Sequence, residues 1–139
     1  MNTTLDGLLD RRVTLEQPAE GYRVAVDTVL LAAAVPIETG QKALDLGCGV
    51  GGAMLCLACR VPGITITGIE IQDELTQLCR ANIARNTFAT GLDVVQGDVA
   101  RLENIFLGKA RSDPPPLEGG VRGGVQKRSL AQAPLTSKN

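Results

Sequence analysis

The spacing of apolar residues changes along the chain and divides it into alternating elements. Apolar runs predict strands at 41–47, 64–71 and 92–99. The first run has apolar residues on both faces, as in a buried strand, and the second is rich in β-branched residues. Segments with helical apolar spacing or helix-ending residues predict helices at 28–36, 51–63, 73–88 and 100–106. This strand–helix order is typical of a doubly wound α/β sheet in which the 41–47 strand is central. Residues 6–18 form a short lead-in.

A change in composition near residue 107 predicts the domain boundary. The 139 residues, 44% of them hydrophobic, suit one small domain. Residues 1–107 hold 8 Lys and Arg against 13 Asp and Glu, whereas 108–139 hold 6 against 2. Nine of the last 32 residues are Gly or Pro, and no helical or strand period is present. We therefore expect a folded domain over 1–107 and a basic, disordered tail over 108–139.

Charge and hydropathy favour a cytoplasmic protein. The formal net charge is -1 and the pI is about 5.4, which argues against general binding to nucleic acids or membranes. No apolar run is long enough to span a bilayer, and the N-terminus does not resemble a signal peptide. We expect no membrane partner.

The cysteines do not predict a metal or redox centre. Cys56 and Cys59 form a C-x-x-C motif, but there is no second such pair and no histidine in the chain. Both lie in an apolar helical stretch, where small buried side chains are expected. We predict no metal site.

The loop in "ALDLGCGVGG" (43–52) is a candidate cofactor site between the first predicted strand and helix. Glycines there allow a close backbone approach, and ligands bind at the carboxyl ends of parallel strands. Gly47, Gly49 and Gly52 fit the G-x-G-x-x-G pattern of dinucleotide binding, while Gly47, Gly49 and Gly51 fit the G-x-G-x-G pattern of S-adenosylmethionine enzymes. The glycines alone do not decide between them.

Three acidic residues favour S-adenosylmethionine. Asp45 precedes the loop, where a carboxylate would repel a pyrophosphate but suits the methionyl ammonium. Glu70 ends the second predicted strand and could accept from both ribose hydroxyls, a role that NAD enzymes also use. Asp98 follows the third strand and could accept from the adenine amine, although it could equally cap a helix.

The chain resembles a bacterial methyltransferase family between about Leu8 and Phe106. The matching segments are "GYRVAVDTVLLAAAVP", "ALDLGCGVGG", "GIEI", "ANIARN" and "GDV". The family belongs to the class I S-adenosylmethionine-dependent methyltransferases, which have a Rossmann-like fold. Its members methylate the exocyclic amine of the adenine beside the anticodon of a valine tRNA. The resemblance therefore implies the N-terminal part of this fold and tRNA or another nucleic acid as partner.

The resemblance also implies a set of cofactor-binding residues. Asp45 and the loop glycines would line the methionine end, Glu70 would hold the ribose, and Ile71 would pack against the adenine. Asp27 would lie over the methionine end, although a helix-capping role with Thr28 is the alternative. The full predicted set is Asp27, Asp45, Leu46, Gly47, Cys48, Gly49, Gly51, Glu70, Ile71, Asp98 and Val99.

The family's catalytic segment has no counterpart in this sequence. Relatives carry Asn-Pro-Pro-Tyr after a fourth strand, where it positions the target amine and stacks on the base. The segment 113–116 reads Asp-Pro-Pro-Pro, has no apolar strand before it and offers no aromatic ring, so we interpret it as coil. We predict no catalytic residue and expect a C-terminally truncated domain with an unrelated tail and impaired activity. A non-catalytic nucleic-acid-binding fragment and an NAD-binding oxidoreductase are the alternatives.

Overall fold

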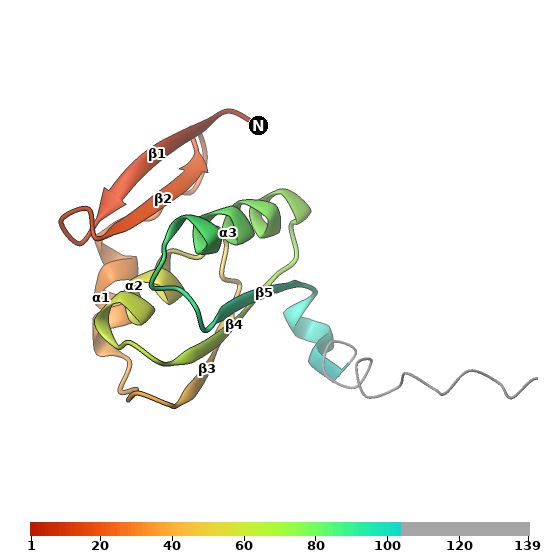
Figure 1. Cartoon of the computed structure of the whole chain (residues 1–139). Coiled ribbons are helices and arrows are strands. Elements are labelled where there is room, and N and C mark those ends of the chain that lie inside the picture. Colours follow the sequence, from red (N-terminus) through yellow and green to blue (C-terminus); the bar gives the residue numbers. More distant parts are fainter. Residues whose placement is uncertain (104–139) are drawn as a thin grey trace, which may run out of the picture.

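A three-stranded parallel sheet forms the base of the fold in this computed structural model, which describes residues 1–103 (Figure 1). Its strands are β3 (Lys42–Leu46), β4 (Thr65–Glu70) and β5 (Leu92–Gln96), in the order β3-β4-β5. The register places Asp45 beside Gly68 and Gly68 beside Val94. The three carboxyl ends therefore meet along one edge, as in the predicted doubly wound α/β sheet.

Helices connect the strands as the sequence predicts. Helix α2 (Gly52–Arg60) joins β3 to β4, and α3 (Asp73–Arg85) joins β4 to β5. Helix α1 (Val26–Ala34) precedes the sheet and packs against α2. A short 3-10 helix, η1 (Val99–Arg101), follows β5, and residues 102 and 103 begin an α-helix within the range predicted over 100–106. The rest of that prediction, the 108–139 tail and the 113–116 segment lie outside the described residues.

Two sequence predictions differ from the structure. The lead-in is an antiparallel hairpin of β1 (Thr3–Leu8) and β2 (Val13–Pro18). Its turn places Leu9, Asp10 and Arg11 at positive φ, a conformation for which the sequence offers no glycine or asparagine signal. Within residues 1–103, β3 is an edge strand. This position fits the expected N-terminal part of the fold, although the apolar residues of the strand by themselves predict a central one.

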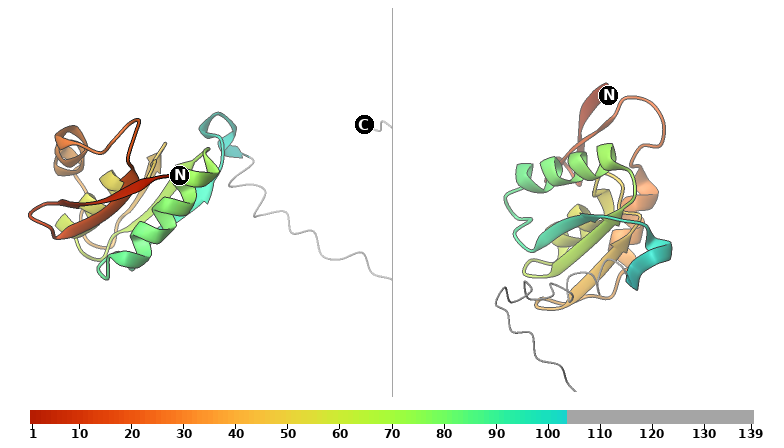
Figure 2. Two further views of the ribbon diagram at one scale, coloured as in Figure 1. Left: turned by 90° about the horizontal axis from the view of Figure 1, so that it is seen from above. Right: turned by 90° about the vertical axis from the view of Figure 1, so that its right-hand side faces the viewer.

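The hairpin lies across α2 and α3, on the side of these helices away from the sheet (Figures 1 and 2). Along β2 the side chains alternate, so that Val13, Leu15 and Gln17 are buried. Val13 and Leu15 join one core with Leu55 of α2 and Ile66 of β4. The first 18 residues are thus an integral layer of the domain.

The sheet also has a less covered side. Leu44 and Leu46 of β3 are more than half exposed, whereas Ala43 and Asp45, which alternate with them, are half-buried. No helix among residues 1–103 is long and apolar enough to cross a bilayer.

Candidate functional site

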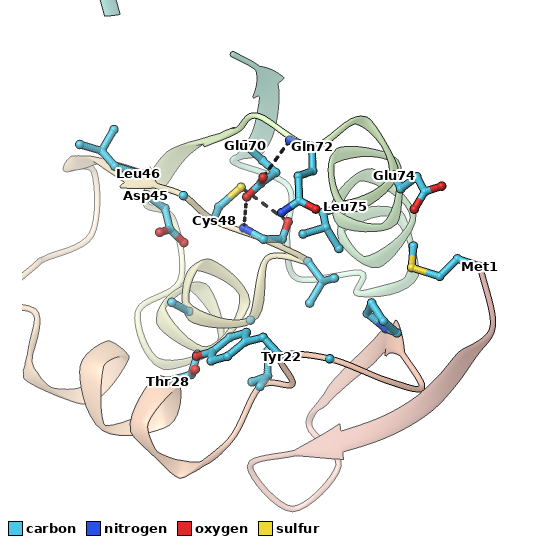
Figure 3. A pocket seen from close by; sticks show the side chains of 18 of the residues that line it. Met1, Tyr22, Thr28, Asp45, Leu46, Cys48, Glu70, Gln72, Glu74 and Leu75 are labelled. Carbon is cyan, nitrogen blue, oxygen red and sulfur yellow. Dashed lines mark hydrogen bonds between the residues drawn. The ribbon is translucent and has the colours of Figure 1, made fainter. Parts of the chain in front are cut away.

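A cavity of about 570 Å³ lies at the carboxyl ends of β3 and β4 (Figure 3). The loop between β3 and α2 forms one wall. The segment from β2 to the first turn of α1 and the beginning of α3 provide the other walls. The cavity lining includes six of the predicted cofactor residues: Asp45, Leu46, Gly47, Cys48, Gly49 and Glu70.

The glycine loop is held against the end of β4 by its own backbone. The amides of Gly47 and Cys48 both donate to the carbonyl of Ile69, at 2.8 and 3.1 Å. Gly51 precedes α2 with φ +88°, and a Cβ there would lie 2.8 Å from Sγ of Cys79. A side chain at this position would be strained and would clash, so the loop path depends on glycine.

Glu70 ties the end of β4 to the glycine loop. Its Oε2 accepts from the Gly49 amide at 3.0 Å, and its Oε1 accepts from the Gln72 amide at 2.9 Å. The side chain is only 6% exposed, yet it lines the cavity. Each carboxylate oxygen can accept more than one hydrogen bond, so Glu70 can hold the loop and still accept from hydroxyl groups of a ligand.

Asp45 presents a buried carboxylate oxygen without a partner. Oδ2 of Asp45 is inaccessible to solvent and accepts no hydrogen bond from residues 1–103. Burial raises the pKa of this carboxyl group, and the nearby backbone N–H of Met54 opposes the rise only in part. Buried polar atoms are nearly always paired. The side chain points into the cavity (Figure 3) and is suited to a cationic ligand group.

The other predicted residues do not line this cavity. Gly51 ends the loop as the N-cap of α2, and Asp27 is exposed in the first turn of α1. Neither Asp27 nor Thr28 is the N-cap of α1, which is Ala25. Ile71 is 60% exposed just after β4, and Val99 is 44% exposed in η1. Ile71 and Val99 follow the carboxyl ends of β4 and β5, outside the cavity lining.

Asp98 has the capping role that the sequence left open. It precedes η1, and its Oδ1 accepts from the Ala100 amide at 2.8 Å. This bond occupies one lone pair only and leaves other acceptor positions on the carboxylate.

Sequence reasoning missed the wall opposite the glycine loop. Tyr22 and Thr28 line the cavity there, and Gln72, Glu74 and Leu75 line it at the start of α3. The segment "GYRVAVDT" (21–28) was part of the family resemblance. Its position opposite the glycine loop depends on the hairpin before it, which the sequence did not predict.

The cysteines serve packing. Cys48 packs on Gly68, where a Cβ would lie 2.7 Å from its Sγ. A hydrogen bond with Cys79, together with burial, raises the pKa of the Cys48 thiol, which keeps it uncharged. Burial also raises the pKa of Cys56 to about 11. Nowhere in residues 1–103 do three or more potential ligands gather in a group that could hold a metal ion.

Comparison with known proteins decides the family. The profile of a family described as "Methyltransferase domain" matches residues 37–113, which are 77 of the 139 residues. The chain belongs to this methyltransferase family. The matched segment begins before β3 and includes the glycine loop, Glu70 and Asp98. The expected fold and the expected membership of an enzyme family, the class I S-adenosylmethionine-dependent methyltransferases, are thereby confirmed.

Two curated relatives carry the name tRNA1(Val) (adenine(37)-N6)-methyltransferase. The protein of Yersinia enterocolitica is 40% identical over 78 residues, covering 55% of this chain and 31% of its own length. That of Porphyromonas gingivalis is 30% identical over 133 residues, covering 88% of this chain and 52% of its own length. The methyltransferase chain thus spans about a third to a half of these relatives.

A solved structure supports the fold. Precorrin-6y C5,15-methyltransferase of Geobacter metallireducens superposes with a TM-score of 0.50 at 13% identity, covering 55% of this chain and 40% of that one.

Proposed function

We propose that the cavity binds S-adenosylmethionine, with its methionyl ammonium beside Asp45. The unpartnered, buried Oδ2 of Asp45 is the observation that carries this proposal. An ammonium group provides both a hydrogen bond and the opposite charge that this oxygen lacks. A pyrophosphate at the same place would bring two negative groups together, which disfavours a dinucleotide.

The remaining predicted residues suit the rest of the cofactor. Glu70 retains acceptor capacity for ribose hydroxyls while it holds Gly49 and Gln72. Ile71 offers an exposed apolar side chain for the adenine, with Asp98 and Val99 beyond it. The loop residues Leu46, Gly47, Cys48, Gly49 and Gly51, and Asp27 on α1, complete the proposed set.

When bound, S-adenosylmethionine supplies a methyl group activated by its sulfonium sulfur. The residues described above bind and orient this group, and we assign no proton transfer and no catalytic residue to them. Positioning of donor and acceptor is itself a large part of the rate enhancement in group transfer.

For the substrate we propose the exocyclic amine of an adenine in tRNA. The names of the curated relatives support this substrate. The 139-residue sequence contains no Asn-Pro-Pro-Tyr segment. We therefore propose that the chain by itself binds the cofactor but transfers methyl groups to tRNA weakly or not at all.

Calorimetry with the full chain tests the proposal. S-adenosylhomocysteine, the demethylated product, should bind at one site per chain, and NAD at the same concentration should neither bind nor compete. Binding of NAD in place of S-adenosylhomocysteine would overturn the cofactor assignment. Measurable transfer of radiolabelled methyl groups to valine tRNA would contradict the expected impairment and leave the cofactor assignment intact.

We expect the affinity for S-adenosylhomocysteine to increase with pH above the ordinary Asp45 pKa of 3.8. Burial raises the pKa of Asp45 in the free protein, whereas the ligand's ammonium would lower it in the complex. At a pH between these two pKa values, Asp45 is protonated in the free protein and ionised in the complex, so binding must release a proton. The affinity then rises by up to about tenfold per pH unit and levels off above the raised pKa.

Calorimetry in buffers of different ionisation enthalpy measures this proton release. The matched control is Asp93→Asn, which removes an exposed carboxylate of β5 and should keep the pH dependence. A flat pH profile of the native chain would show that Asp45 does not face a cation.

A further inference from the structure

The outer edge of β2 is paired with side chains of α3. Oδ1 of Asn82 accepts from the Glu16 amide at 2.7 Å, and its Nδ2 donates to the Glu16 carbonyl at 2.8 Å. Asn86 makes the same two bonds with Thr14, at 2.9 and 2.8 Å. Asn82 lies in the last turns of α3 and Asn86 is its C-cap, so the two side chains, four residues apart, reach the same strand. Together they bind two edge peptide groups of the strand, as a neighbouring strand would.

The two asparagines differ in their other contacts. Oδ1 of Asn82 also accepts from the Arg85 guanidinium, at 3.4 Å. Nδ2 of Asn82 also donates to the carbonyl of Val50 in the glycine loop, at 3.0 Å. Nδ2 of Asn86 instead donates to the carbonyl of Asn82 in its own helix, at 2.7 Å. Asn82 is fully buried, and Val50 lines the cavity. One buried carboxamide therefore joins the hairpin to the glycine loop.

The hairpin in turn holds the opposite wall. Gln17 of β2 is 2% exposed, and its Oε1 accepts from the Val24 amide at 2.8 Å. Arg23 donates to the Pro18 carbonyl at 2.7 Å and forms an ion pair with Asp6 of β1. Pro18 and Val24 both line the cavity. A displacement of β2 would therefore move this wall.

We propose that Asn82 is a positioning residue of the cofactor cavity. Through Glu16 it holds the hairpin wall, and through Val50 it holds the glycine-loop wall. Asn82 thus bonds directly to both walls, although it does not itself line the cavity. Its effect on ligand affinity depends on the proposed cofactor function, whereas its effect on the loop does not.

Two matched variants separate positioning from general stability. Asn82→Asp and Asn86→Asp each keep the oxygen that accepts from β2 and each remove an amide group with two donated hydrogen bonds. Only the first variant loses a bond to the glycine loop. We would measure hydrogen exchange at the Gly49 and Gly51 amides, both hydrogen-bonded at the loop, in the free protein. Calorimetry would then give the affinity for S-adenosylhomocysteine, with both variants kept below their melting transitions.

In Asn82→Asp, we expect exchange at the two glycine amides to rise about tenfold or more, and the affinity to fall by a similar factor. In Asn86→Asp, the exchange rates of the two glycine amides and the affinity for S-adenosylhomocysteine should stay within about twofold of the native chain. Equal effects of the two variants on loop exchange would overturn the inference. A native chain that binds no S-adenosylhomocysteine would refute the cofactor proposal alone, because the exchange comparison still decides the role of Asn82.

If Asn82→Asp does not melt cooperatively, the variant cannot be used. Amide hydrogen exchange of the native chain, measured at several low urea concentrations, then takes its place. The inference requires the amides of Glu16 and Gly51 to share one urea dependence, because opening at Asn82 frees both segments. Unrelated urea dependences at these amides would contradict it.

Discussion

Replacing Asp45 by asparagine is expected to stabilise the free protein at pH 7 and to weaken S-adenosylhomocysteine binding by about 30- to 150-fold. Loss of one partner from a buried charge pair costs about 2–3 kcal/mol of binding free energy. The stability change has the opposite sign. Burial raises the pKa of Asp45 above its unfolded value, so the ionised carboxylate costs folding free energy, and this cost grows as pH rises through the folded pKa.

Thermal melting and calorimetry of the same preparations measure both effects. Glu74→Gln is the matched control because it removes an exposed carboxylate that also lines the cavity. Its affinity should change by less than about threefold, as expected for a solvent-screened charge. A melting temperature of Asp45→Asn below that of the native chain, or an unchanged affinity for S-adenosylhomocysteine, would show that the Asp45 carboxylate does not pair with the ligand's ammonium.

Replacing Glu70 by glutamine is expected to lower both stability and affinity. Each oxygen of the native carboxylate accepts from a backbone amide, but a glutamine has only one oxygen and must turn its NH₂ group toward one of the two donors. The unpaired buried amide should cost about 2 kcal/mol of unfolding free energy. For a domain of this size that lowers the melting temperature by about 10 °C.

The same variant should weaken S-adenosylhomocysteine binding by about 100-fold, since the glycine loop loosens and a ribose acceptor is lost. Asp73→Asn is the control: its carboxylate accepts from the side chain of Gln77 on the helix surface. That change should stay within about 0.5 kcal/mol of native stability. An unchanged melting temperature in Glu70→Gln would mean that Glu70 does not hold the loop.

The comparison of these two variants shows what the sequence could predict of the site. The order of strands and helices placed Asp45 and Glu70 at the carboxyl ends of neighbouring strands, and both do line the cavity. Nothing in the sequence distinguished a paired carboxylate from an unpaired one. That difference depends on whether the Gly49 and Gln72 amides point at Glu70, which only the path of the loop determines.

The hairpin escaped prediction for a specific physical reason. Val13, Thr14, Leu15 and Glu16 do alternate in the manner of a half-buried strand, but the run is short. Its turn uses left-handed backbone at three residues that rarely adopt it. The wall around Tyr22 was therefore not placed, although its segment had been singled out.

Helix α3 shows a related limit. The apolar residues 75, 78, 79 and 83 indicate its core-facing side, yet Thr76, Asn82 and Asn86 are more deeply buried than most of them. Periodicity detects apolar burial and cannot detect a polar surface that faces a strand backbone.

The asparagine pairs along β2 have a further consequence for aggregation. A strand edge with free amides and carbonyls is a template on which other chains can add strands. The carboxamides of Asn82 and Asn86 pair with the backbone groups of Thr14 and Glu16, so the β2 edge of the hairpin is closed to such growth. Within residues 1–103 the outer edge of β3 carries no such protection, and Leu44 and Leu46 lie beside it. Self-association of this domain at high concentration should therefore involve the exposed edge of β3, while the β2 edge of the hairpin stays out of any growing sheet.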